Sequence, residues 1–410
     1  MFDPTTIKFG EPVWHDEPYT HPLLRKEVSR DFYDREIEKS RVEMVLRSVS
    51  RKPALIIGER RSGKTSLLRL LADKLDNDPS ERFISVLIPW QGIQSRDVLA
   101  KEILQGIRAR IDKKRQDSEQ PASFKHDLNT TGEFIATLRQ LLTLISDKTV
   151  IICIDEFDSI VEDATPDEQD KIFGLAHALI EITDLPVNLL LTMARIPNIP
   201  ETRSSPIIAK SEQIHLHPFS SDEFNKMTEG LLGESIRDLT PEDLRRLFEL
   251  SGGWPYFAKL LLIYLAELPP EKATLDQALE LAVDNSSVEQ ALSNIYTTHF
   301  DDSEKAIVLL LVKRNGRVSA EEMAAVDTSL KAAADQLTKR GFVLKNKDGS
   351  YSFRIGFLKN WFQNWVKYDL EVERHLTEIL QRLERLRDPW AGSKPAIVTD
   401  KDLERYGQRV

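Results

Sequence analysis

A short apolar segment that runs directly into a glycine-bounded loop is the strongest constraint on how this chain can fold. The segment is Ala54–Ile57, the loop Gly58–Thr65 reads G-E-R-R-S-G-K-T, and a helix-like pattern begins at Ser66. Glycines at this spacing let the backbone fold tightly and direct its N–H groups at a polyphosphate. The N-terminus of the following helix would attract the same anion. The segment therefore predicts a strand–loop–helix unit that binds nucleotide phosphates.

The last residues of the loop carry the chemistry expected of such a unit. Lys64 is placed to reach the β- and γ-phosphate oxygens, and the Thr65 hydroxyl to hold Mg²⁺. A chance glycine-rich turn is the alternative, but the strand, the spacing and the helix all agree with the first interpretation. The predicted nucleotide-binding residues of this segment are Gly58, Glu59, Arg60, Arg61, Ser62, Gly63, Lys64, Thr65 and Ser66.

A second apolar run, further along the chain, ends in two carboxylates. Thr149–Ile154 is followed by Asp155 and Glu156, and an uninterrupted apolar run of this kind is typical of a strand buried on both faces of a parallel sheet. Asp155 would reach the Mg²⁺ shell through water, and Glu156 would polarise the water that attacks the γ-phosphate. Asp158 is expected to be a helix N-cap or a surface acid.

Composition excludes several classes of protein. The chain has 410 residues, 41% of them apolar and 30% charged, as in a soluble globular protein of two or three domains. A net charge of −10 argues against a protein that coats nucleic acid. The single cysteine, Cys153, falls in the predicted buried strand, so a disulfide framework and a zinc cluster are excluded. The sequence has neither a long apolar run nor a basic-then-apolar leader, so we expect a cytoplasmic protein that does not interact with membranes.

Apolar runs alternate with helix-like segments through the first half of the chain. The predicted strands are 54–57, 82–88, 149–154, 187–193 and 213–217. Such alternation implies a right-handed, doubly wound parallel sheet, an α/β core over residues 35–219. The other predicted parts are an N-terminal wrapping segment (1–34), an all-α lid (220–285), a connector (286–300), a winged helix-turn-helix domain (301–368), an amphipathic helix (369–388) and a mobile tail (389–410).

The winged-helix prediction rests on three helical patterns followed by two alternating strands. Asp348-Gly349 between the strands predicts a type I′ hairpin turn. The middle of the presumed recognition helix, Ala332–Asp335, offers no side chain suited to reading base edges. Packing on the core or on a partner and binding of duplex DNA therefore stay open as alternatives. The cations that could contact DNA are Lys331, Lys339, Arg340, Lys345 and Lys347.

One further pair could bind a metal. His215 and His217 alternate along a predicted strand, but no cysteine or carboxylate stands at matching spacing. We therefore expect structural histidines.

Several segments carry a family resemblance. The loop at Gly58–Leu68 resembles that of the signal-transduction (STAND) branch of AAA+-related P-loop ATPases, and within it the prokaryotic archaeal ATPase-like group. Gly252–Tyr256 resembles the G-G-x-P element of that group's lid, and Leu191–Arg195 its sensor strand. Phe9–Val13 and Phe32–Glu36 resemble its G-x-P-V and F-x-G-R-E elements, with Asp34 in place of the usual glycine.

The resemblance implies a P-loop NTPase core and roles for three more residues. Arg35 would lie near the adenine, Pro255 would abut the base, and Arg195 would read the γ-phosphate. Arg195 as a surface cation and Pro255 as a helix-starting proline are the plainer alternatives. The pair Asp155-Glu156 departs from the Asp-Asp of many members toward the hydrolytic form, which favours real turnover.

Together these features predict a switch that binds ATP or ADP with Mg²⁺ and hydrolyses ATP slowly. Asp155, Glu156 and Arg195 are the predicted catalytic residues, and Thr65 and Asp155 the metal-binding ones. The nucleotide state would control self-association or engagement of a protein effector. The alternative is a DNA-loading ATPase similar to the origin-recognition-type initiators, which would use the winged helix. A helicase or transport motor is disfavoured because no further motor motif is present.

Overall fold

The computed structural model describes residues 35–48, 52–80, 82–88, 90–115, 130–145, 148–182, 184–194, 207–232, 239–268, 274–284, 288–289, 292–293, 295–365, 374, 376–379 and 381. The chain divides into a compact unit of residues 32–217, the core unit, and a second unit that includes Pro218 onward. Each is described by itself. The predicted N-terminal segment, most of the helix at 369–388 and the tail lie outside the described residues.

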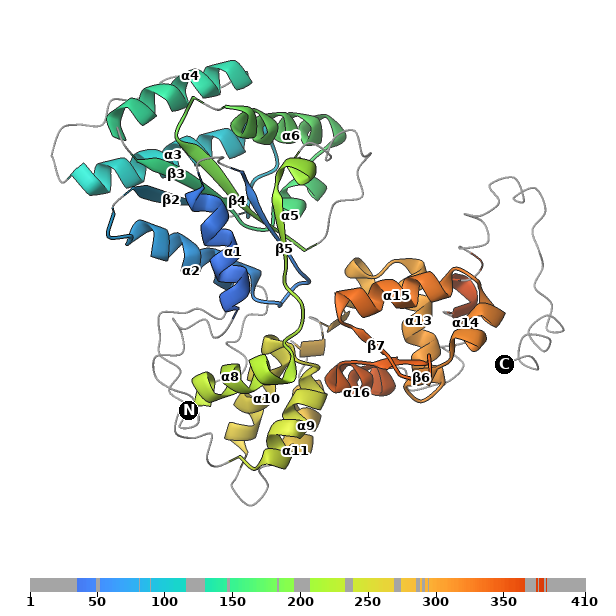
Figure 1. Ribbon diagram of the computed structural model, residues 1–410. Coiled ribbons are helices and arrows are strands. Elements are labelled where there is room, and N and C mark those ends of the chain that lie inside the picture. The colour runs from blue at the N-terminus through green and yellow to red at the C-terminus, as the bar shows by residue number, and fades with distance from the viewer. Residues whose placement is uncertain are drawn as a thin grey trace, which may run out of the picture. The chain divides into compact units, whose positions relative to one another are not determined.

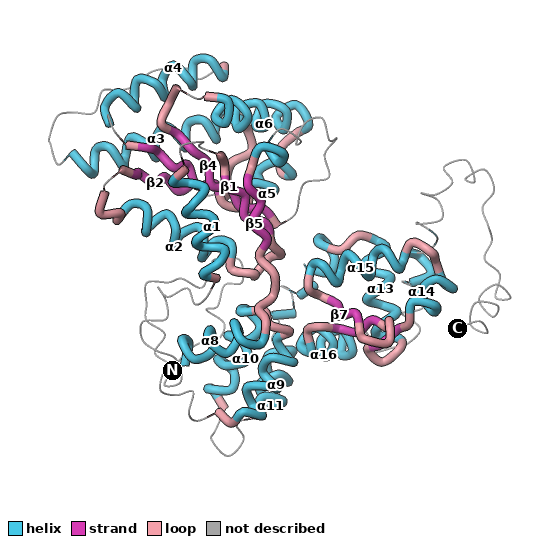
Figure 2. Tube along the Cα trace, in the orientation of Figure 1, coloured by secondary structure: helices cyan, strands magenta, loops and turns pink. Residues whose placement is uncertain are grey.

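A five-stranded parallel sheet forms the centre of the core unit (Figures 1 and 2). The strand order is β2-β3-β4-β1-β5, so that β4 lies between β1 and β3. Every residue of β1 and β4 is buried, as expected of strands covered on both faces. The strands are β1 (Ala54–Ile57), β2 (Phe83–Ile88), β3 (Thr149–Ile154), β4 (Val187–Met193) and β5 (Glu212–His215).

Helices cover both faces of this sheet. On one face, α1 (Glu36–Arg47) and α2 (Lys64–Asp76) contribute Val42 and Leu67 to a core that also contains Cys153. The opposite face packs against four helices: α3 (Arg96–Arg115), α4 (Thr131–Leu142), α5 (Phe157–Glu162) and α6 (Pro166–Glu181). The predicted doubly wound parallel sheet is confirmed.

The sequence also explains where several helices begin. The side-chain oxygen of the cap residue accepts a hydrogen bond from the backbone N–H three residues on, and the carboxylate at that position accepts one from the backbone N–H of the cap residue. This reciprocal pair fixes the first turn, and it occurs at Thr130/Glu133, Thr240/Asp243, Asp301/Glu304 and Ser319/Glu322.

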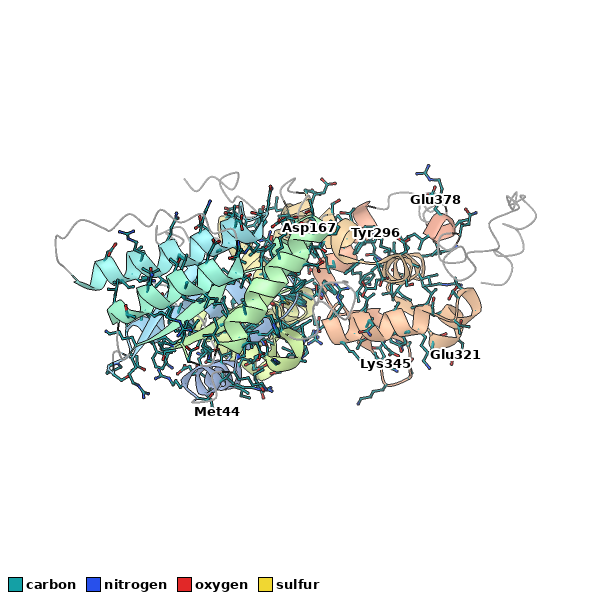
Figure 3. The ribbon with its side chains drawn as sticks, turned by 90° about the horizontal axis from the view of Figure 1, so that it is seen from above. Met44, Asp167, Tyr296, Glu321, Lys345 and Glu378 are labelled. Atoms are coloured by element: carbon teal, nitrogen blue, oxygen red, sulfur yellow. The ribbon has the colours of Figure 1, made fainter. Side chains whose placement is uncertain are left out.

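The outer face of α1 carries two exposed apolar side chains. Ile37 is 78% exposed and Met44 is 67% exposed (Met44 is labelled in Figure 3).

The second unit begins with four helices, which we call the helical bundle. Trp254 precedes one of them and is 2% exposed, and Pro255 stands at the first helical position, where its missing N–H costs nothing. The four helices are α8 (Ser221–Leu232), α9 (Pro241–Ser251), α10 (Pro255–Glu267) and α11 (Leu275–Val283).

Three helices, a small antiparallel sheet and a last helix follow; we call residues 301–365 the C-terminal module. The sheet has the order β6-β8-β7. A π-helical turn at Ile295–His299 leads into the module and places the Tyr296 ring 5.3 Å from that of Phe362 (Tyr296 is labelled in Figure 3). The elements are α13 (Asp302–Lys313), β6 (Arg317–Val318), α14 (Ala320–Val326), α15 (Leu330–Arg340), β7 (Val343–Lys345), β8 (Tyr351–Phe353) and α16 (Gly356–Trp365).

The hairpin between β7 and β8 exists, but its predicted type I′ turn is wrong. A type I′ turn needs positive φ at both central residues, and in this hairpin only Gly349 has it, with φ 81°. Asn346 N–H instead donates to Ser350 O at 2.7 Å, which leaves a three-residue loop. The Asp348 carboxylate accepts from Ser350 N–H and Oγ–H, and this local pairing selects the longer loop.

The predicted strand that carries His215 and His217 is shorter in the structure than expected. The strand β5 ends at His215, so His217 lies beyond it, and the two imidazole rings stack with centroids 6.1 Å apart. The described residues contain no group of three or more His, Cys, Asp or Glu able to hold a metal.

None of the described helices is long and apolar enough to cross a membrane.

Candidate nucleotide-binding site

The phosphate-binding loop predicted from the sequence connects β1 to α2 at the carboxyl edge of the sheet. Gly58 N–H donates to Met193 O at 3.1 Å, which fixes the start of the loop on the neighbouring strand β4. A Cβ at Gly58 would lie 2.8 Å from Ser62 Oγ and 3.0 Å from Leu216 Cβ, so only glycine fits there. Gly63, with φ 97°, precedes the first residue of α2. The first-turn N–H groups of that helix have no partner within the helix.

Lys64 is buried at the start of α2, with 6% of its surface exposed. Its Nζ donates to Gly58 O at 2.8 Å and to Glu59 O at 3.1 Å, so the ammonium lies against its own loop. Burial lowers the pKa of Lys64, and the nearby carboxylates, Asp158 first among them, oppose that shift. A buried cation surrounded by acids and beside a glycine-bounded loop is suited to bind phosphate.

Ser62 supplies an observation that tests whether this loop fits a phosphate. Its side chain is 3% exposed, and within the described residues its Oγ has no hydrogen-bond partner. A buried hydroxyl without a partner costs about 1–3 kcal/mol. A phosphate oxygen in the loop would satisfy it.

Asp155, directly after β3, is held by two hydroxyl groups. Thr65 Oγ1 donates to Asp155 Oδ2 at 2.8 Å, and Thr192 Oγ1 donates to Asp155 Oδ1 at 2.6 Å. The predicted Mg²⁺ residues, Thr65 and Asp155, are therefore brought together although they are ninety positions apart. A hydroxyl and one carboxylate fit Mg²⁺, which binds oxygen ligands and takes most of them from phosphate and water.

Glu156 has a backbone conformation that is rare for a residue with a side chain. Its φ is 46° and ψ is 49°, in the left-handed region, and it is the N-cap of α5. Its N–H donates to Thr192 Oγ1 at 2.9 Å. Burial raises the pKa of Glu156. The positive charge of Arg60 opposes this rise more strongly than any other cation does. A raised pKa is common at carboxylates that exchange protons with water.

Asp158 is neither a surface acid nor the N-cap of α5. Its side chain is 4% exposed, and its Oδ2 accepts a hydrogen bond from Ala194 N–H at 2.9 Å, just after the end of β4. The expectation was wrong because α5 starts one residue after Glu156 and turns this carboxylate toward the sheet.

The family resemblance implies roles for three more residues, Arg195, Arg35 and Pro255, and none of these roles is tested by the contacts in this cluster. Arg195 lies outside the described residues, so its role stays a prediction. Arg35 is 2% exposed, and its Nη1 and Nη2 donate to Glu38 Oε1 at 3.1 Å and to His217 O at 2.5 Å. Pro255 belongs to the second unit and starts α10. Contact of Arg35 or Pro255 with a base stays a prediction.

Sequence reasoning missed two members of the site, Thr192 and Asp158. A single threonine stands in the apolar strand Val187–Met193, and a third acid follows Asp155-Glu156. Both signals are visible, but their meaning depends on β4 lying beside β3.

Comparison with known proteins agrees with this geometry. Residues 32–261 match the family described as an ATPase domain predominantly from Archaea. A Walker-type ATPase of Pyrococcus abyssi is similar at 18% identity and a TM-score of 0.56, over 81% of this chain and 96% of that one. The ORC2 protein of Aeropyrum pernix, solved in ADPNP–ADP complexes, is similar at 12% identity and a TM-score of 0.52, over 82% and 96%. At these identities the likeness shows the fold alone.

No curated protein matches the chain. The family match, however, spans more than half of the 410 residues and contains every member of the cluster around Lys64 and Asp155. The chain is therefore a member of the family of ATPase domains found predominantly in Archaea, with the fold of a P-loop NTPase core.

Proposed function

We propose that this chain is a regulatory nucleotide switch of the STAND type, which binds ATP with Mg²⁺ and hydrolyses it slowly. Its nucleotide state would control self-association or the engagement of a protein effector. The observation that carries the proposal is the convergence of Lys64, Thr65, Asp155 and Glu156 at one edge of the sheet. Family membership supplies the reaction, ATP hydrolysis.

Each residue of the cluster has a role in this mechanism. Lys64 and the loop N–H groups would bind the β- and γ-phosphates. Thr65 and Asp155 would hold Mg²⁺, which neutralises charge on the phosphate oxygens when bound. Glu156 would orient the attacking water and accept its proton, a role for which its raised pKa is suited. Arg195 would sense the γ-phosphate, and Arg35 and Pro255 would lie near the base.

The proposal treats the C-terminal module as a winged helix that contacts protein rather than DNA. Of the five cations proposed for DNA contact, two are already paired with acids. Arg340 Nη1 lies 2.5 Å from Glu304 Oε2, and Lys345 Nζ lies 3.4 Å from Asp335 Oδ1 (Lys345 is labelled in Figure 3). Lys331, Lys339 and Lys347 are exposed, and three such cations give only a small phosphate-binding surface.

The experiment combines turnover with assembly. Glu156→Gln should lower ATP turnover by about 10²- to 10⁴-fold while leaving ATP bound. Light scattering of this variant should then show a larger species with ATP than with ADP, and Asp163→Asn, an exposed acid at the end of α5, serves as the control. A parent-like hydrolysis rate in Glu156→Gln would remove Glu156 from the mechanism. Equal mass in both nucleotides, with and without proteins captured from the host, would leave an ATPase without a switch.

DNA binding is tested separately. If the module contacts protein, the double variant Lys339→Glu with Lys347→Glu should differ little from the parent in its binding to duplex DNA. Binding of the parent to duplex DNA at low salt, lost in this double variant and weakened steeply by salt, would instead support the initiator-like alternative.

A further inference from the structure

The backbone at Glu156 has a left-handed conformation that contacts with other elements must stabilise. A non-glycine residue in the left-handed region costs of order 1–3 kcal/mol, and it persists only where its surroundings impose that conformation. The N–H of Glu156 is fixed by Thr192 Oγ1 at 2.9 Å. That bond fixes the amino side of the residue, and its carbonyl oxygen accepts from Ser159 N–H at 2.9 Å and Ile160 N–H at 3.3 Å, which ties it to the first turn of α5.

Asp158, two residues after Glu156, attaches this first turn of α5 to the neighbouring strand. Its Oδ2 accepts from Ala194 N–H at 2.9 Å. Thr192 belongs to β4, and Ala194 directly follows Met193, the last residue of that strand. The turn from Asp155 to Asp158 is thus attached to β4 at both ends, with Glu156 between the attachments.

The burial of Asp158 is itself informative. A carboxylate that is 4% exposed is costly to bury, and an apolar side chain of similar size would stabilise a short helix as well or better. Phe157, Ile160 and Val161 already bury the apolar face of α5. The charge is balanced in part by the buried cation Lys64, and the hydrogen bond to the residue after β4, rather than packing, explains why a carboxylate stands here.

We infer that Asp158 is a positioning residue for ATP hydrolysis: by binding Ala194 N–H, it holds Glu156 in the backbone conformation that orients the attacking water. The inference rests on the proposed role of Glu156. Asp158 itself touches neither phosphate nor water in this mechanism, because it acts through the turn.

The experiment uses the full chain and measures kcat separately from the Kd for ATP. Asp158→Ala removes the acceptor and should lower kcat about 10- to 100-fold with Kd within about threefold of the parent, as expected when a reacting group is displaced by about 1 Å. Asp158→Asn keeps an oxygen that can accept from Ala194 and should retain most of kcat. Asp163→Ala, on the exposed end of the same helix, is the matched control and should behave like the parent.

A double-variant cycle tests whether Asp158 acts through Glu156. In the Glu156→Gln background, Asp158→Ala should cause no further loss of kcat, because residues that act as one unit are not additive. Additive losses would overturn the inference, as would a rise in Kd that parallels the fall in kcat. If Asp158→Ala does not fold, a loss of more than about tenfold in Asp158→Asn overturns it equally. A parent-like rate in Glu156→Gln alone would instead defeat the proposed function, so the two failures are distinguishable.

Discussion

Trp254 donates its indole Nε1–H to the carbonyl oxygen of Gly341 at 3.2 Å, and its ring stacks on that of Phe342 with centroids 5.5 Å apart. This contact joins the start of α10 in the helical bundle to the end of α15 in the C-terminal module. Arg354 Nε donates to Gly252 O at 2.9 Å beside it. The segment that resembles a nucleotide-contacting element of the lid is therefore also a structural joint within the second unit.

Gly253 shows why this joint requires glycine. Its φ is 79°, and a Cβ at this position would lie 2.4 Å from the carbonyl oxygen of Phe219. The backbone following Pro218 can approach the start of α10 this closely only when no side chain intervenes.

Trp254→Ala should destabilise the second unit by about 3–5 kcal/mol, because it removes a fully buried aromatic ring and leaves a cavity. Denaturant unfolding measures the loss, and limited proteolysis should show earlier cleavage in the C-terminal module. Leu344→Ala, which removes a side chain that is 39% exposed in the same module, is the control and should cost far less. Unchanged stability of Trp254→Ala would mean that the joint is not needed to hold the bundle and the module together.

Lys64→Ala should weaken ATP binding about 10- to 100-fold, since each hydrogen bond to a charged group contributes about 1.5–3 kcal/mol. Calorimetry with ATP measures the change. The matched control is Lys74→Ala on the same helix α2, where the lysine is 57% exposed and pairs with Glu43. Equal affinity in the two variants would contradict the assignment of the phosphate-binding loop.

Thr192→Val should reduce both stability and turnover. Valine has the shape of threonine but leaves one oxygen of Asp155 and the N–H of Glu156 without the partner seen in the structure. Unsatisfied buried groups cost about 1–3 kcal/mol. Thr228→Val, at another fully buried threonine whose hydroxyl donates to Phe224 O, controls for the stability term. If turnover per folded molecule falls equally in both variants, Thr192 has no specific part in the site.

Arg340→Met should destabilise the C-terminal module most strongly near neutral pH. Burial raises the pKa of Glu304, and Arg340 opposes that shift. Because the folded pKa lies above the unfolded value of 4.5, ionising Glu304 costs stability as the pH rises through the folded pKa. Without Arg340 the buried carboxylate is unpaired, so we expect a loss of about 3–5 kcal/mol at pH 7.

The same variant makes a pH-dependent prediction. As the pH falls below 4.5, Glu304 becomes protonated in both proteins, and the deficit of Arg340→Met should shrink. Denaturant unfolding at both pH values checks it. The control is Arg317→Met, which breaks an exposed pair with Asp348 and should cost about 0–1 kcal/mol at either pH. A deficit that does not depend on pH would locate the effect in lost packing of Arg340 on Phe300 and Phe342 instead.

Local patterns in the sequence were sufficient to predict much of the core fold of this protein. The apolar runs at Ala54–Ile57 and Thr149–Ile154 predicted buried parallel strands, and the loop from Gly58 to Thr65 predicted the strand–loop–helix unit that joins β1 to α2. The pairing of Thr65 with Asp155 also followed, because the carboxyl ends of parallel strands share one edge of the sheet. These features depend on residues close together in the chain or on a rule that holds for every such sheet.

Tertiary structure decided the rest. The insertion of β4 between β1 and β3 brings Thr192 and Ala194 to Asp155 and Asp158. The lone threonine in this apolar strand is visible in the sequence, but nothing near it indicates which residue it would bind. In the C-terminal module, the sequence placed Arg340 among the cations that could contact DNA, and the fold pairs it with Glu304. Strand order and ion pairing join residues tens of positions apart, and such contacts depend on how the elements pack rather than on the periodicity of any one of them.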